Sequence, residues 1–303
     1  MRLPLTTATH RTSTRPPSHP ISHPPGHPPT HRASRRGGGV LNVAHRGASS
    51  EVAENTLAAV RRAVELGADL VEIDVRRSKD GALVLMHDAT LTRTTDVQRV
   101  FPRRAPWRVG DFTYDELKRL DAGSWRASTF EGERVATLEE VLDVIGPSKT
   151  GLLLELKSPE LYPGIVADVV AQMRDLRRLV DPALAEGRMV VQSFDVAAMK
   201  EHKTLAPSVP VGLLGTASRA NLPALGTWAD QLNPSHFSVD KGYVDQVHRA
   251  GMQCLVWTVD RPPAMRRALR IGVDGVITNR PSSLKRLLEG REPARSGRAA
   301  LPR

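Results

Sequence analysis

The chain contains 303 residues, 40% of them hydrophobic, which suits a globular protein with a substantial core. No apolar run approaches the ~20 residues that span a bilayer, and the single cysteine, Cys254, excludes an intrachain disulfide and fits a reducing compartment. The net charge of +10 comes mainly from residues 1–39 (+6) and 286–303 (+3), which leaves +1 for residues 40–285 and argues against a nucleic-acid partner.

The first 39 residues are predicted to be a disordered tail rich in proline, histidine and arginine. They hold eight prolines and six arginines but no acidic residue, so they cannot bury enough apolar surface to offset the entropy lost on ordering. They also lack the apolar stretch of roughly 7–15 residues that a secretory signal carries, so a cytoplasmic location is expected. Residues 40–285 are predicted to form one domain, followed by a basic C-terminal tail over residues 286–303.

From residue 40 on, short β-branched runs alternate with amphipathic helical stretches. Such alternation over about 240 residues is typical of an α/β fold with a parallel sheet, and eight repeats favour a closed TIM-type (β/α)8 barrel over an open, doubly wound sheet. No G-x-G-x-x-G follows the first run, so a dinucleotide-binding fold has no support. The predicted strands are Leu41–Ala44, Leu70–Val75, Leu152–Leu156, Met189–Gln192, Val211–Leu214, His236–Val239, Leu255–Val259 and Gly275–Thr278, and the helical stretches include Glu54–Leu66, Pro163–Leu179, Gly242–Ala250 and Pro263–Ile271.

A further predicted strand, Ala82–His87, does not fit this alternation. Too few residues separate it from the second barrel strand for a helical crossover, and Asp80-Gly81 is typical of a two-residue hairpin turn. If these two residues form the turn, Asp74 lies opposite His87. The second barrel strand is therefore predicted to continue into a hairpin that folds His87 back over the barrel mouth.

Residues 89–150 then lack a barrel strand. Two helix starts of the capping-box type, Thr113-x-x-Glu116 and Thr137-x-x-Glu140, lie within them. We predict that Leu91–Ser128 is a small insertion at the barrel mouth, and that Leu138–Ile145 is the helix that leads to the third barrel strand.

Charged residues occupy the carboxyl ends of predicted barrel strands, where the active sites of such barrels lie. The second strand carries Glu72 and Asp74 on one face, and the third carries Glu155 followed by Lys157. A parallel barrel strand has no solvated face, and two like charges ~4 Å apart repel by roughly 4 kcal/mol at an effective dielectric of ~20. The carboxylates therefore predict a hard cation, Ca²⁺ or Mg²⁺, because oxygen-only ligands suit such ions; a buried ion-pair network with Arg46 and Lys157 is the alternative.

Two histidines are predicted to converge on these carboxylates. His45 ends the first strand beside Arg46, and His87 lies in the hairpin. A hard cation beside Arg46 and Lys157 makes a positive pocket that suits a phosphate ester, and two imidazoles can act as general base and general acid. The residues thus predict a metal-dependent phosphodiesterase or, without catalysis, a phosphate-binding module.

The order of these motifs resembles the signature of the glycerophosphodiester phosphodiesterase family, over about residues 41–283. The resemblance rests on Ala44-His45-Arg46-Gly47, Glu54-Asn55-Thr56, Glu72-Ile73-Asp74, Lys79-Asp80-Gly81, His87-Asp88, Arg93-Thr94-Thr95, Glu155-Leu156-Lys157, Gln192-Ser193-Phe194, Trp257-Thr258-Val259 and Gly275-Val276-Ile277-Thr278.

The resemblance implies that a small glycerophosphodiester is hydrolysed to glycerol 3-phosphate and a free alcohol. Trp257 is a further candidate for contact with the substrate. The roles implied by the matching positions are metal ligand for Glu72, Asp74 and Glu155, acid–base catalyst for His45 and His87, and phosphate contact for Arg46 and Lys157.

The chain departs from the family's usual pattern at two positions. Ala53 stands where proline is usual, and Asn279 stands after Thr278 where aspartate is usual. The first change affects loop stiffness, and the second leaves open whether Asn279 helps to orient the site.

Lysophospholipase D-like or sphingomyelinase D-like cleavage is the alternative activity. A hydrophobic groove beside the barrel mouth would favour it, whereas a narrow polar pocket would favour small water-soluble diesters. Four aromatic residues of the insertion region could line such a groove or form the insertion's own small core: Phe101, Trp107, Trp125 and Phe130.

Overall fold

The computed structural model of the protein describes residues 39–291. Eight parallel strands form a closed ring, because β1 pairs with both β2 and β9, and β3 pairs antiparallel with β2 outside the ring. The predicted (β/α)8 barrel is therefore confirmed and the open sheet is excluded. The strands are β1 (Leu41–His45), β2 (Leu70–Arg77), β3 (Leu83–Leu85), β4 (Gly151–Leu156), β5 (Met189–Ser193), β6 (Val211–Leu214), β7 (Gln231–Asn233), β8 (Gln253–Val256) and β9 (Gly275–Thr278).

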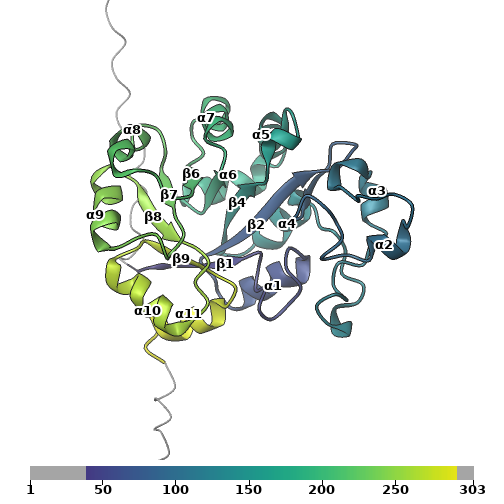
Figure 1. Ribbon diagram of the computed structural model, residues 1–303, viewed down its shortest axis with the longest axis horizontal. Helices are drawn as coiled ribbons and strands as arrows, with labels where there is room; N and C mark the ends of the chain where they lie inside the picture. The colour runs from purple at the N-terminus through teal and green to yellow at the C-terminus, as the bar shows by residue number, and fades with distance from the viewer. Residues whose placement is uncertain (1–38, 292–303) are drawn as a thin grey trace, which may run out of the picture. The chain divides into compact units, whose positions relative to one another are not determined.

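Helices surround the strands (Figure 1). Both predicted capping boxes are present, at Thr113 and Thr137, and the stretch predicted as one helix over 163–179 is two helices that meet at Leu176. The helices are α1 (Leu57–Glu65), α2 (Val97–Val100), α3 (Tyr114–Leu117), α4 (Leu138–Ile145), α5 (Ile165–Asp175), α6 (Arg177–Ala185), α7 (Val196–Leu205), α8 (Leu222–Leu225), α9 (Lys241–Arg249), α10 (Pro262–Ile271) and α11 (Pro281–Leu288).

The barrel interior contains an apolar layer directly below the charged strand ends. Val43, Leu70 and Leu153 belong to this layer, and each precedes an ionisable residue by two positions in its strand. Because side chains two residues apart share one face of a strand, His45, Glu72 and Glu155 also face the interior. The other members of the layer are Val190, Leu255 and Ile277.

The sixth barrel strand is β7 (Gln231–Asn233), so the prediction of a strand at His236–Val239 was wrong. Two amide residues of β7 are held by partners on other strands: Asn233 Nδ2 donates to Gln192 Oε1 at 2.8 Å, and Gln231 Nε2 donates to Gln253 Oε1 at 3.0 Å. Asparagine is depleted in β-strands relative to β-branched and aromatic residues. These side-chain hydrogen bonds explain why a polar segment, rather than the more apolar run that follows it, completes the barrel.

The predicted hairpin is present, but its register differs by one residue. The N–H of Met86 donates to the carbonyl of Asp74 at 2.9 Å, so Met86 and not His87 lies opposite Asp74. The reason is that the loop contains three residues, 79–81, rather than two. Its last residue, Gly81, has φ of +95°, which glycine adopts without the steric cost that a Cβ atom brings.

The predicted insertion has a small apolar core of its own. Figure 1 shows α2 and α3 beyond the end of β2. Phe101 and Trp107 pack against this core, whereas the Trp125 side chain remains 39% exposed. The buried residues of the core are Val84, Met86, Leu91, Val97, Val109, Phe112, Leu117, Leu120, Ala122 and Val135.

The predicted tails fall largely outside the described residues, which exclude 1–38 and 292–303. Helix α11 continues to Leu288, so residues 286–288, predicted as the start of a tail, belong to the last helix. Within residues 39–291, none of the helices is both long enough and hydrophobic enough to cross a bilayer. The cytoplasmic location and the absence of a nucleic-acid partner stay predictions.

Candidate active site

Three buried carboxylates meet at the carboxyl ends of β2 and β4. Glu72 and Asp74 come from β2, and the strand register places Glu155 of β4 directly beside Asp74. Each residue offers one oxygen, and these oxygens lie within 4.8 Å of one another, while none of the three residues is more than 6% exposed. The structure thus brings together the three carboxylates that the sequence predicted as metal ligands.

The cationic side chains nearby neutralise this cluster only in part. Burial, followed by the charge of Asp74, raises the pKa of Glu72 well above its ordinary value and raises the pKa of Glu155 to about 7. Burial also opposes the charge on Asp74, but Arg46 and Lys157 outweigh it and lower the pKa of that carboxyl. A divalent cation would favour the ionised form of all three.

The cluster fits a hard divalent cation. The Oε1 atom of Glu72 and the Oδ1 atom of Asp74 are buried and lack a hydrogen-bond partner within residues 39–291. Burying a polar atom without a hydrogen-bond partner costs free energy, and without a bound cation this cost would apply to both oxygens. Carboxylate oxygens are the donors that Ca²⁺ and Mg²⁺ prefer.

Arg46 reaches the cluster because the chain turns back directly after β1. Gly47 has φ of +80°, and a Cβ atom there would lie 2.6 Å from the backbone of Ala59, so only glycine permits this close approach to α1. The turn directs the Arg46 backbone N–H to Glu72 Oε2 at 2.8 Å. The guanidinium Nε lies 3.2 Å from Asp74 Oδ2.

Lys157 approaches the cluster from the side of β4. Its Nζ lies 2.7 Å from Glu155 Oε1 and 3.6 Å from Asp74 Oδ1. Arg46 contacts the other oxygen of Asp74, so the two cations flank this carboxylate. The predicted phosphate contacts are therefore both at the acidic cluster.

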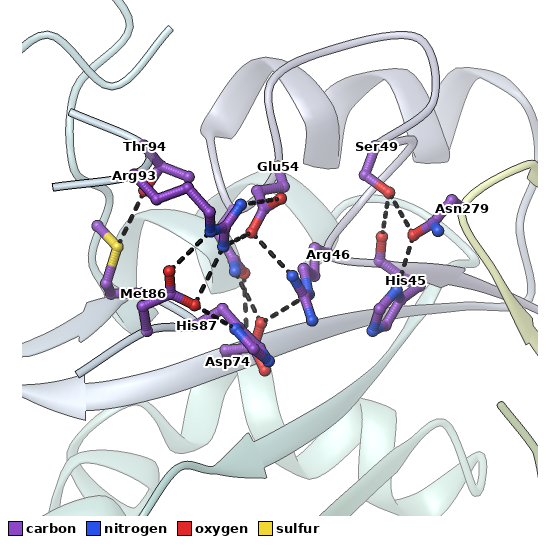
Figure 2. Close-up of polar contacts among 12 residues, drawn as sticks. His45, Arg46, Ser49, Glu54, Asp74, Met86, His87, Arg93, Thr94 and Asn279 are labelled. Atoms are coloured by element: carbon purple, nitrogen blue, oxygen red, sulfur yellow. Dashed lines mark hydrogen bonds and ion pairs between the residues drawn. The ribbon is translucent and has the colours of Figure 1, made fainter. Parts of the chain in front are cut away.

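His45 lies beside the cluster, since β1 pairs with β2 in a register that places it next to Glu72. Its Nε2 is 3.9 Å from Glu72 Oε2. Figure 2 shows its other ring nitrogen, Nδ1, beside the amide of Asn279, and the distance from Nδ1 to Asn279 Oδ1 is 2.7 Å. Asn279 in turn donates through Nδ2 to Asp260 at 2.7 Å. Burial and then Arg46 lower the pKa of His45 to about 4.

His87 is held through both its backbone and its ring. The buried guanidinium of Arg76 donates to the carbonyl oxygens of Met86 and His87, at 3.1 and 2.6 Å. The ring Nδ1 lies 2.6 Å from Asp88 Oδ1. Burial lowers the pKa of His87, whereas the charge of Asp74 opposes that shift.

Arg93 connects the two halves of the site (Figure 2). Its Nε donates to Asp88 Oδ2 at 2.7 Å, and its two terminal nitrogens donate to both oxygens of Glu54, at 3.0 and 2.7 Å. Glu54 Oε1 also accepts from Arg46 at 2.9 Å. One guanidinium from the insertion therefore supports the carboxylate behind His87 and the carboxylate behind Arg46.

Trp257 directly follows β8, at the same end of the barrel as the acidic cluster. Its Nε1 donates to the Asn233 carbonyl at 2.7 Å, and its ring packs edge-on against Phe194 at a centroid distance of 5.7 Å. The ring of Phe194 is 5.9 Å from Lys157 Nζ. Phe194 is 55% exposed and Phe237, in the loop after β7, is 86% exposed, so apolar surface borders the site on this side.

Several residues with contacts to the site received no role from the sequence alone. Arg93 and Glu54 belonged to the quoted motifs, and Asn279 marked a departure from the family's pattern. Asp260 had only one signal, an acid directly after the predicted seventh barrel strand. Arg76 had none, because an arginine on a strand usually points to solvent.

Residues 45–283 match the model of the Glycerophosphoryl diester phosphodiesterase family. The chain is 38% identical over 252 residues to the "Glycerophosphodiester phosphodiesterase" of Caldanaerobacter subterraneus subsp. tengcongensis, which covers 82% of this chain and 97% of that protein. A phosphodiesterase of Oleispira antarctica, solved in complex with the product sn-glycerol-3-phosphate, is 29% identical with a TM-score of 0.70 and covers 82% of this chain and 96% of its own. A crystal structure from Silicibacter pomeroyi is 30% identical with a TM-score of 0.70 and covers 83% of this chain and 94% of its own.

The acidic cluster predicts that Ca²⁺ or Mg²⁺ stabilises the protein. An ion present at 100 times its Kd should add about 2.7 kcal/mol to the free energy of unfolding, seen as a higher Tm than in EDTA. Glu72→Gln should remove this shift, yet leave Tm in EDTA equal or higher, because it removes a crowded buried carboxyl. Glu139→Gln, on the exposed face of α4, is the control. Equal shifts in wild type and Glu72→Gln would contradict the prediction.

Proposed function

Because this chain belongs to the glycerophosphoryl diester phosphodiesterase family, we propose that it hydrolyses glycerophosphodiesters to glycerol 3-phosphate and a free alcohol at the site on β1, β2 and β4. The chain is a phosphodiesterase. One observation carries the assignment of the site: a buried cluster of three carboxylates, flanked by Arg46 and Lys157, lies beside the ring of His45. The product bound in the Oleispira antarctica structure supports the substrate class.

The acidic cluster would hold the divalent cation through Glu72, Asp74 and Glu155. When bound, such an ion supplies positive charge that stabilises the negative charge developing on the phosphoryl oxygens. Either Ca²⁺ or Mg²⁺ suits these ligands. Arg46 and Lys157 now pair with the carboxylates, and they offer further N–H donors to a phosphate that enters between them.

His45 and His87 supply acid–base catalysis. One imidazole takes a proton from the attacking oxygen, which is either water or the neighbouring glycerol hydroxyl, as that oxygen forms a bond to phosphorus. The bond from phosphorus to the alcohol oxygen breaks, and the second imidazole donates a proton to that oxygen. If the glycerol hydroxyl attacks first, water then opens the cyclic phosphate by the same exchange of protons in reverse.

Phe194 and Trp257 would form the apolar side of the substrate pocket, where Trp257 packs behind the more exposed Phe194. The exposure of Phe194 and Phe237 favours a second candidate activity, cleavage of diesters that carry a hydrocarbon chain, as in lysophospholipase D-like enzymes. Exposed aromatic side chains clustered at the mouth of a barrel suit an apolar ligand group.

His45→Ala and His87→Ala should each lower kcat for glycerophosphocholine by about 10²–10⁴-fold, and the cation-dependent shift in Tm should persist in both. A p-nitrophenyl ester of glycerol phosphate releases an alcohol that needs no protonation. The variant that lacks the general acid should therefore recover most of its rate with this ester, and the other variant should not. Wild-type rates in either variant would remove the acid–base assignment.

Arg93→Ala should lower kcat at least about tenfold, because partners that orient catalytic groups typically contribute this much. Arg93→Lys should recover little of it, since an ammonium lacks the planar fork that reaches two carboxylates at once. Arg99→Ala, in the same insertion but at an exposed ion pair with Asp96, should retain wild-type kcat. Unchanged kcat in Arg93→Ala would show that the contacts to Asp88 and Glu54 are dispensable.

Substrates that differ only in a hydrocarbon chain test the second activity. If the aromatic rim binds the chain, kcat/KM for a short-chain lysophosphatidylcholine should exceed that for glycerophosphocholine, by up to about fourfold per buried methylene. Phe237→Ser should abolish the excess and leave glycerophosphocholine hydrolysis unchanged. Equal kcat/KM values for the two substrates would leave the small diesters as the only candidates.

A further inference from the structure

The hydrogen bonds behind His45 have a single direction. Asp260 accepts from the backbone N–H of Asn279 at 2.9 Å, from Asn279 Nδ2 at 2.7 Å and from the Thr278 hydroxyl at 3.1 Å. An ionised carboxylate can only accept. Asn279 must therefore turn its Nδ2 toward Asp260, and this fixes the orientation of an amide whose two ends are otherwise alike in shape.

The amide oxygen of Asn279 then faces the ring of His45. Because a carbonyl oxygen can only accept, the Nδ1 atom 2.7 Å away must carry the hydrogen. In the neutral ring, Nε2 is left with a lone pair. The hydroxyl of Ser49 lies 2.8 Å from the same amide oxygen and 2.7 Å from the His45 carbonyl oxygen. Its hydrogen can be donated to either acceptor, so Ser49 links the Asn279 amide to the His45 backbone.

We infer that Asp260, acting through Asn279, is a positioning residue that sets the Nδ1–H tautomer of His45 and so makes Nε2 the proton acceptor of the reaction. Nε2 is the nitrogen on the side of the acidic cluster, 3.9 Å from Glu72 Oε2. The inference rests on the proposed function and specifies which histidine acts as the base and which as the acid. The proton of the attacking oxygen passes to His45, and His87, paired with Asp88, donates a proton to the departing alcohol.

The carboxylate of Asp260 does not contact His45 itself, because the neutral amide of Asn279 lies between them. Where the family's usual aspartate would contact the histidine with its own charge, this chain places a neutral amide there and the charge on Asp260 behind it. The amide transmits the polarity of the carboxylate, donating to it at one end and accepting from His45 at the other. Exchanging the two residue types should therefore preserve the direction of the hydrogen bonds.

The test combines tautomer measurement with kinetics in full-length variants. In ¹⁵N-histidine NMR spectra, the signals that vanish in His45→Ala identify the ring, and wild type should show hydrogen on Nδ1. Asp260→Asn should give a mixture of tautomers, because the Asn279 amide can then rotate, and should lower kcat at least about tenfold with KM within about twofold. The exchange variant, Asp260→Asn with Asn279→Asp, should restore both the tautomer and kcat to within about threefold.

Asp274→Asn is the matched control. Asp274 also bridges β8 and β9, through the Cys254 N–H at 2.8 Å, but it precedes β9 and so lies at the opposite end of the barrel from the site. This variant should lower Tm and leave the tautomer and kcat of wild type unchanged. A wild-type tautomer and kcat in Asp260→Asn, or an exchange variant no better than Asp260→Asn, would overturn the inference. Full activity in His45→Ala would instead overturn the proposed function.

Discussion

Three carboxylates buried within 4.8 Å of one another determine how the rest of the site is built. Their mutual repulsion at buried positions must be relieved, either by protonation or by positive charge. Two protein cations already contact Asp74, one at each oxygen, and oxygens of Glu72 and Asp74 still lack a hydrogen-bond partner within residues 39–291. The site is thus poised for additional cations and for the phosphate that they attract.

The two histidines have different supports. Behind His45 stands a neutral amide, and behind His87 stands a carboxylate that is itself held by Arg93. A neutral acceptor leaves an imidazole free to take up a proton, whereas a carboxylate stabilises the protonated ring. The two imidazoles at the barrel mouth therefore differ in how strongly their surroundings favour the protonated form, although both belong to histidines.

Much of the site could be predicted because its signals are local. Glu72 and Asp74 alternate with aliphatic residues in one strand, and Asp80-Gly81 marks a turn, so the barrel, the hairpin and the acidic cluster followed from neighbouring residues. The hairpin register did not, since two-residue and three-residue loops share the same sequence signal. Strand β7 and the role of Asp260 were also missed, because each depends on hydrogen bonds between segments about 20 or more residues apart.

The insertion has its own apolar core, yet its Arg93 pairs with Asp88 and Glu54 of the site. Its core is far smaller than that of the barrel, so local opening of this segment costs less free energy than global unfolding. Each such opening would withdraw the guanidinium from Glu54 and Asp88 while the barrel remains folded. Reversible inactivation on warming would then begin below the temperature at which the barrel melts.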